Sequence, residues 1–244
     1  MKNLHSLGIL ASLLVGILFS SANVMADPFK NLTFLTENYA PYNYSKDGKL
    51  QGISIGLMLR IFKRAGSSKT VNDIQLLPWA RAYRLAQDKK NTVLFVMTRT
   101  KSRENMFKWV GPITPTTIAV IAKKSLRAKI DNFTDLNKYK IGAIRDDIGE
   151  LLLKKNGLSS SNIHLTNSSV STAKMLASGR IDMWAYESQV ALWNLMEIGE
   201  NSDDYEVLYL LEESMLYIAL QKDTDDTVVT SMQEALDAVV KQEK

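Results

Sequence analysis

Residues 93–112 read VLFVMTRTKSRENMFKWVGP, and this stretch is the most informative part of the chain. Residues 93–97 are apolar and rich in β-forming side chains, so they predict a strand buried on both faces in a mainly parallel sheet. Polar residues follow at the carboxyl end of that strand, where open α/β sheets have their ligand crevices. Arg99 and Arg103 lie there, and the planar donor fork of an arginine matches a carboxylate. We therefore expect a small ligand that carries a carboxylate.

Strands and helices alternate on both sides of this stretch. The hydrophobic patterns predict strands at 31–36, 74–77, 116–122, 141–144, 163–165, 181–185 and 215–220, and helices at 52–65, 80–87, 147–156, 171–178, from 188 onward and at 227–240. Such regular alternation favours βαβ units and an α/β fold.

The first 26 residues have the layout of a secretory signal peptide. Lys2 supplies the positive charge, residues 7–19 are apolar, and small residues precede Asp27 as at a cleavage site. The apolar run is too short to predict a membrane span, although an uncleaved N-terminal anchor is the alternative. We therefore expect export to the periplasm.

The composition excludes several classes of function. Without residues 1–26, the chain has 29 basic and 26 acidic side chains, and they form no basic cluster, so we expect no nucleic-acid partner. No cysteine is present, and a chain of this length can bury a core without disulfides. His164 is the one histidine of the mature chain, and no Gly-rich phosphate loop occurs. We therefore expect neither a metal nor a cofactor.

With these elements in order, the chain resembles the bacterial extracellular solute-binding proteins of family 3, which serve ABC importers and include polar amino-acid binders. Six short segments carry the resemblance, and they lie at 32–37 with 39–42, at 47–53, at 98–100 with 103–104, at 109–112, at 140–142, and at 179–182 with Glu187. The segments occur in the order of the family and span nearly all of the mature chain.

The resemblance implies a fold of the type II periplasmic-binding-protein kind, with two α/β lobes joined by two crossover strands. Lobe 1 would comprise residues 27–113 and 214–244, and lobe 2 would comprise residues 114–213. The crossovers would lie near 114–119 and 210–216. The implied protein is a monomer that closes on its ligand by hinge bending.

The resemblance also implies roles for residues at the ends of strands. Arg103 would pair with the ligand carboxylate and Thr98 would add a donor, while Arg99 is the alternative fork. Glu187 occupies the position of the family's aspartate that accepts hydrogen bonds from an α-ammonium. Because glutamate is one methylene longer, the amine contact would differ from that of the family.

Four aromatic or acidic side chains would complete the site. Glu37 and Tyr39 match an acid and an aromatic that cover the ligand, and Trp79 is predicted to point into the same cleft. Asp147 lies at the start of a helix where the family binds the carboxylate with backbone donors. Two aspartates would cap that helix but oppose an anion, which favours a ligand with a cationic portion.

Each residue also has a plain structural interpretation: Arg103 as a surface arginine, Glu187 as a solvated carboxylate at a helix start, and Trp79 as lobe packing.

The implied function is delivery of an amino acid or related polar carboxylate to an inner-membrane permease. The alternatives are presentation of the ligand to a sensor receptor, and a dehydratase-like enzyme with Glu37 or Glu187 as the base. We expect no catalysis.

The SxxK pattern at 171–174 lacks its companion motifs, so it predicts a helix with Ser171 as N-cap.

Overall fold

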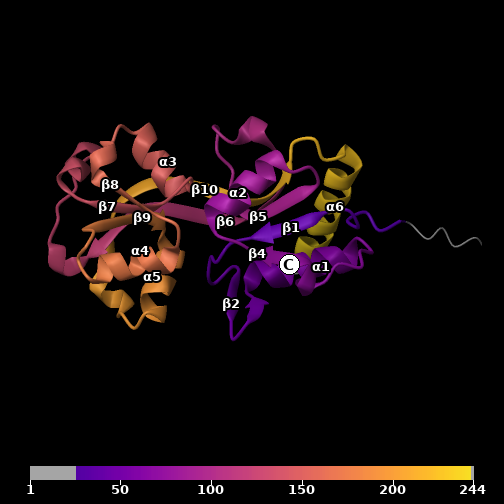
Figure 1. Ribbon diagram of the computed structural model, residues 1–244, viewed down its shortest axis with the longest axis horizontal. Helices are drawn as coiled ribbons and strands as arrows, with labels where there is room; N and C mark the ends of the chain where they lie inside the picture. The colour runs from indigo at the N-terminus through magenta and orange to yellow at the C-terminus, as the bar shows by residue number, and fades with distance from the viewer. Residues whose placement is uncertain (1–25, 243–244) are drawn as a thin grey trace, which may run out of the picture.

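The protein is described by a computed structural model that covers residues 26–242, so the predicted signal peptide lies outside the described residues except for Ala26. Figure 1 shows two lobes side by side, with helices around a sheet that continues from one lobe into the other. This mixed α/β architecture confirms the predicted fold class. Within residues 26–242, no helix is long and apolar enough to cross a membrane.

One eight-stranded sheet has the order β4-β1-β5-β10-β6-β9-β7-β8. Its strands are β1 (Thr33–Thr36), β4 (Ile74–Leu76), β5 (Thr92–Thr98), β6 (Phe107–Lys123), β7 (Ile141–Ile144), β8 (Ile163–Thr166), β9 (Met183–Glu187) and β10 (Tyr205–Gln221), and a separate hairpin pairs β2 (Tyr44–Lys46) with β3 (Lys49–Gln51). The three strands at each end of the large sheet are parallel, whereas β6 and β10 are antiparallel to their neighbours. The prediction of a mainly parallel sheet is therefore wrong for the middle, because β10 returns the chain from the second lobe to the first.

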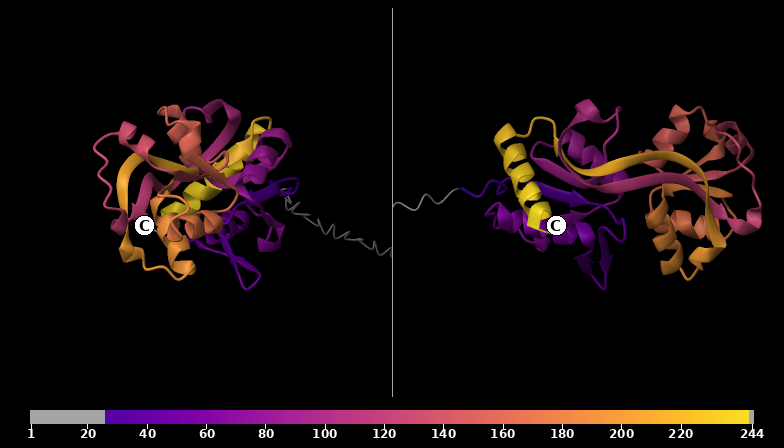
Figure 2. Two further views of the ribbon diagram at one scale, coloured as in Figure 1. Left: turned by 60° about the vertical axis from the view of Figure 1, so that its left-hand side comes forward. Right: turned by 180° about the vertical axis from the view of Figure 1, so that it is seen from behind.

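The two strands that cross between the lobes, β6 and β10, are 17 residues long each. They pair with each other from one end to the other, and Figure 2 shows them running together between the lobes. The pairs Thr116↔Ser214 and Ala119↔Leu210 fall within the predicted crossovers. Both strands are longer than predicted, because their half-exposed central portions lack a continuous apolar pattern. The residues at which the lobes divide stay a prediction.

Helices cover both lobes. The first lobe has α1 (Ile53–Arg64), α2 (Trp79–Asp88) and α6 (Asp226–Gln242), and the second has α3 (Ile148–Lys155), α4 (Ser169–Ala177) and α5 (Ser188–Glu197). Short 3-10 helices occur at Val71–Asp73, Glu104–Met106, Lys124–Leu126, Phe133–Lys138, Ser160–Asn162 and Ser202–Asp204. The predicted N-cap Ser171 is wrong, because Ser168 has the extended backbone of an N-cap and its side chain accepts from the Ser171 N–H.

Strand β5 is buried along its whole length, as the apolar run predicts. Met97 pairs with Tyr217 and Phe95 pairs with Ile218, so Val96 is an extra residue in the β5–β10 ladder. Val96 also has a positive φ of 65°. Such a bulge bends a strand and redirects the residues that follow it. Thr98 is the last residue of β5, two residues after this bulge.

Candidate functional site

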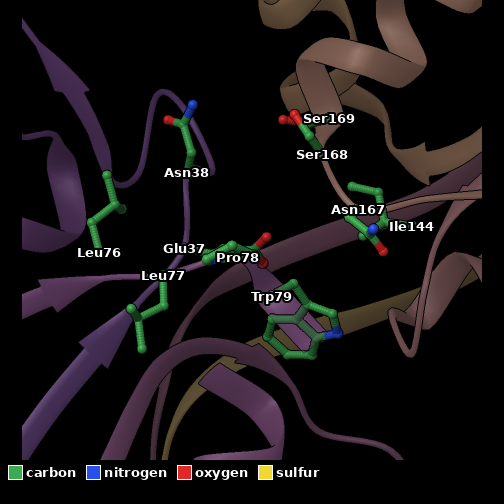
Figure 3. A pocket seen from close by; sticks show the side chains of 10 residues that line it. All are labelled: Glu37, Asn38, Leu76, Leu77, Pro78, Trp79, Ile144, Asn167, Ser168 and Ser169. Carbon is green, nitrogen blue, oxygen red and sulfur yellow. The ribbon is translucent and has the colours of Figure 1, made fainter. Parts of the chain in front are cut away.

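A pocket of about 240 Å³ lies between the two lobes. Its walls are Glu37, Asn38, Leu76, Leu77, Pro78 and Trp79 from the first lobe and Ile144, Asn167, Ser168 and Ser169 from the second, as Figure 3 shows. These residues lie at or just beyond the carboxyl ends of β1, β4, β7 and β8. The pocket is thus at the edge where α/β sheets bind ligands.

Arg103 is buried between the lobes, with 1% of its surface exposed. Nη1 donates to the Thr98 carbonyl at 3.2 Å and Nη2 donates to the Asp146 carbonyl at 3.1 Å, while Nε has no partner in the described part of the chain. The guanidinium carbon lies 5.2 Å from the ring centre of Trp79 and 5.0 Å from that of Tyr83. None of the ion pairs within residues 26–242 includes Arg103. Its charge is therefore buried without a carboxylate partner from the described chain.

Arg99 has a different environment. Its Nε donates to the Glu104 carboxylate at 2.8 Å, and the second arm of the fork pairs with the other carboxylate oxygen. The guanidinium also packs over the rings of Trp109 and Tyr217, at 5.6 and 5.1 Å from their centres. Because Glu104 occupies this fork, Arg99 is less available for a ligand than Arg103.

Three carboxylates are buried near the same space: Glu37, Asp147 and Glu187 are 7%, 5% and 2% exposed. Burial raises the pKa of Asp147 to about 6, although Arg103 opposes that shift. Burial and the neighbouring Asp147 hold the pKa of Glu37 well above its ordinary value. Oδ2 of Asp147 has no hydrogen-bond partner among the described residues, 26–242. None of the three carboxylates forms an ion pair within residues 26–242, although Arg103 is close enough to lower the pKa of Glu37 and of Asp147.

Two of these acids begin helices. Glu187 ends β9 and is the N-cap of α5, where Oε2 accepts from the Val190 N–H at 2.7 Å. Burial nevertheless raises its pKa, so the interpretation as a solvated carboxylate does not fit. Asp147 occupies the N-cap position of α3 but makes no side-chain capping hydrogen bond, so its predicted capping role is wrong. Its Oδ2 atom is therefore the part of the side chain that could accept a hydrogen bond from a bound molecule.

Aromatic side chains from both lobes meet at this site. Tyr39 packs edge to face against Tyr186 at 5.6 Å, and Tyr186 stacks on Trp184 at 4.8 Å. The Tyr186 hydroxyl and the Nε1 atoms of Trp184 and Trp79 are buried without hydrogen-bond partners. Of these three atoms, only Nε1 of Trp79 belongs to a residue in the wall of the pocket, so it is the donor that a bound polar molecule could contact.

The structure thus brings together Arg103, Thr98, Glu37, Tyr39, Trp79, Asp147 and Glu187, and places Arg99 in its pair with Glu104. The sequence prediction missed Tyr186, the Asp146 carbonyl and the 167–169 loop. Tyr186 and the loop lie at or after the ends of β9 and β8. The rule that pointed to Thr98 therefore applied to them as well. Within residues 26–242, no group of three or more acidic or histidine side chains could hold a metal ion.

Comparison with known proteins gives a family match over residues 32–244, to the bacterial extracellular solute-binding proteins, family 3. No curated protein matches the chain by sequence. Among solved structures, a histidine kinase sensor domain with similarity to periplasmic binding proteins is 18% identical, with a TM-score of 0.77 and coverage of 87% of this chain and 92% of that chain.

Two binding proteins are also similar in structure. The arginine-, lysine-, histidine-binding protein ArtJ from Geobacillus stearothermophilus has 18% identity, a TM-score of 0.73 and coverage of 86% of this chain and 90% of its own. An ABC uptake transporter substrate binding protein from Streptococcus pneumoniae, solved with bound histidine, has 18% identity, a TM-score of 0.76 and coverage of 88% and 89%. At these identities the likeness shows the fold, which is that of type II periplasmic binding proteins, as predicted.

Proposed function

Because the chain belongs to the bacterial extracellular solute-binding proteins of family 3, we propose that it binds a small amino-acid-like molecule between its lobes, with the ligand carboxylate on Arg103. The observation that carries this proposal is the burial of Arg103 without a carboxylate partner within residues 26–242. An unpaired buried charge is strongly destabilising, and a partner that arrives with the ligand removes that penalty. The unpaired Nε leaves a donor available.

The surrounding charges narrow the ligand further. Arg103 faces a region with three buried carboxylates, Glu37, Asp147 and Glu187, and burial raises the pKa of each of them. A cation within about 4–6 Å would favour their ionised forms. The ligand would bring this charge as an α-ammonium and a second cationic group. A basic amino acid satisfies both ends of the site, and the arginine-, lysine- and histidine-binding proteins of similar fold support that choice.

Ligand binding would close the two lobes, with bending in β6 and β10 where they pass between them. The closed protein would deliver the ligand to an inner-membrane permease of an ABC importer, in the periplasm. We propose no catalytic step, so the ligand would be released unchanged.

Signalling is the second candidate, because the similar structures include a histidine kinase sensor domain. In that case the liganded protein would present itself to a membrane receptor. Deletion of the gene separates the two functions: loss of ligand uptake supports import, whereas normal uptake with a changed transcriptional response to the ligand supports sensing.

A thermal-shift experiment tests the binding proposal. L-Arginine, L-lysine and L-histidine are compared with L-glutamine, L-glutamate, putrescine and succinate. Saturation with a basic amino acid at about 100 times its Kd is expected to raise the Tm by about 5–10 °C. Putrescine lacks the carboxylate and succinate lacks the cation, so each should give a smaller shift.

Two arginine variants provide the matched control. Arg103→Ala should abolish the shift, whereas Arg99→Ala should keep it, because Arg99 is engaged by Glu104. The absence of a shift with every amino acid would contradict the proposed function. A larger shift with L-glutamate than with L-arginine would contradict only the proposal that the ligand carries a second cationic group.

A further inference from the structure

Glu150 is a buried carboxylate that does not line the ligand pocket and yet contacts the segment that meets Arg103. It is the third residue of α3, and 3% of its surface is exposed. Oε2 accepts from the Asp146 N–H at 2.6 Å. The other carboxylate oxygen pairs with Nζ of Lys154, which lies half exposed one turn further along the helix. Glu150 therefore ties the start of α3 to the residue before its N-cap.

Asp146 has the backbone conformation that makes this contact important. Its φ is 59°, in the left-handed region that non-glycine residues rarely adopt. The turn is also closed by the Asp147 N–H, which donates to the Ile144 carbonyl at 3.1 Å. The hydrogen bond from the Asp146 N–H to the Glu150 carboxylate stabilises this turn, because hydrogen bonds to a charged acceptor are among the stronger ones in proteins. The turn fixes the direction of the Asp146 carbonyl.

That carbonyl is the acceptor for Nη2 of Arg103, at 3.1 Å. Arg103 belongs to the first lobe, between β5 and β6, and Asp146 belongs to the second lobe, between β7 and α3. The hydrogen bond thus joins the two lobes directly. We infer that Glu150 is a positioning residue: by holding the Asp146 carbonyl against Arg103, it favours the closed arrangement of the lobes and presents the guanidinium in a fixed orientation. This inference rests on the proposed closing of the lobes.

Glu150 also has a simpler role to be separated from this one, because an acidic side chain in the first turn stabilises a helix through its charge. The two roles depend on different properties. Positioning needs a side chain long enough to reach the Asp146 N–H, whereas the helix effect needs a negative charge. Glu150→Gln keeps the length and an acceptor oxygen but loses the charge, and Glu150→Asp keeps the charge but is one methylene shorter.

The test measures the distance between the lobes in the ligand-free protein by double electron–electron resonance. The sequence has no cysteine, so labels can be attached at Lys63→Cys on α1 and Lys174→Cys on α4, which are both exposed positions. The doubly labelled parent should populate the short distance of the closed form. Glu150→Asp should shift the closed-to-open ratio toward the open form by about five- to tenfold, the effect of one hydrogen bond. Glu150→Gln should change it by less than about twofold.

Lys154→Ala is the matched control, because it removes the exposed partner of Glu150 and leaves the bond to Asp146 intact. It should behave like the parent protein, since exposed ion pairs contribute little. The inference would be overturned if the parent populated only the long distance, or if Glu150→Asp gave the same distribution as Lys154→Ala. If Glu150→Gln shifted the lobes toward the open form and Glu150→Asp did not, the role of Glu150 would be to stabilise the helix through its charge. None of these outcomes depends on the identity of the ligand.

Discussion

At the scale of single residues, the site is defined by buried charged groups that form no direct ion pair within residues 26–242. Arg103 is buried without an ion-pair partner among residues 26–242, and Asp147 has an oxygen without a hydrogen bond. Burial of such groups is unfavourable on its own and becomes favourable when a ligand supplies the opposite charges. Under the proposed function, these residues would be arranged for the bound state, and the ligand-free protein would be less stable.

Asp147→Asn tests that loss of stability. Because burial raises the pKa of Asp147 from 3.8 to about 6, the folded protein binds this proton more tightly than the unfolded chain. The stability contributed by Asp147 therefore falls as the pH rises from about 4 to about 6, by up to about 3 kcal/mol. Asp147→Asn removes that dependence. The difference in the free energy of unfolding between the ligand-free variant and the wild type should therefore favour the variant more at pH 7.5 than at pH 4.

Urea unfolding at the two pH values measures this difference. Asp146→Asn is the control, since Asp146 is an exposed neighbour and asparagine also tolerates its left-handed backbone. Equal pH profiles for the wild type and Asp147→Asn would show that Asp147 is not desolvated in the folded protein.

The sequence alone predicted most of these residues, for a physical reason: Thr98, Glu37 and Glu187 lie at or just after strand ends, and strand ends can be located from apolar patterns. The sequence could not show which of the two arginines, Arg103 or Arg99, would be available to a ligand carboxylate. Both arginines lie in the same loop, and only the position of Glu104, which engages one of them, distinguishes their environments. The Asp146 carbonyl was not predictable either, because its direction depends on a backbone turn that the residue type does not determine.

At the scale of elements, close contacts between helix and strand set the shape of the site. Gly149 lies in the first turn of α3, and a Cβ there would be 2.3 Å from the carbonyl oxygen of Ala185 in β9. No rotamer change can relieve this contact, because the opposing atom belongs to the backbone. Helix α3 can therefore approach β9 this closely only with glycine at position 149.

Gly149→Ala should consequently destabilise the protein by about 1–3 kcal/mol, as other overpacking substitutions do. Gly56→Ala is a matched control in α1, where the nearest atom to a new Cβ is the end of the Arg60 side chain at 3.4 Å. Alanine is the better helix former, so Gly56→Ala should stabilise the protein by about 0.5–1 kcal/mol. Urea unfolding of both variants checks the pair, and an equal effect of the two substitutions would refute the close approach of α3 to β9.

The elements also show what the apolar pattern can and cannot locate. Helices α1, α2 and α6 and strand β5 were predicted to within a residue or two, since each has a continuous buried face. The long strands β6 and β10 were predicted only in part. Their central residues are half exposed between the lobes, so burial leaves no clear alternation in the sequence there.

At the scale of the whole molecule, contacts between the lobes would set the affinity for a ligand under the proposed function. Besides the Arg103 hydrogen bond, Tyr44 of the β2–β3 hairpin packs against Trp193 of α5, with 5.9 Å between ring centres. This contact joins the lobes and includes none of the residues that line the ligand pocket. It should therefore strengthen binding without touching the ligand.

Trp193→Ala should weaken the binding of a basic amino acid by about two- to tenfold, the value of one aromatic pair. Trp193→Phe should retain most of the affinity, and Met196→Ala, an exposed change on the same helix, should have no effect. Isothermal titration calorimetry with L-arginine, or with whichever amino acid gives the largest thermal shift, measures these differences. Binding by Trp193→Ala with wild-type affinity would refute a role for this contact in closure.

The most direct test of the central claim is a crystal structure of the protein with the amino acid that gives the largest thermal shift. We predict that the ligand lies between the lobes with its carboxylate within hydrogen-bond distance of the Arg103 guanidinium, and with its cationic groups directed at Glu37, Asp147 or Glu187. A ligand whose carboxylate contacts other residues while Arg103 stays unpaired would contradict the account.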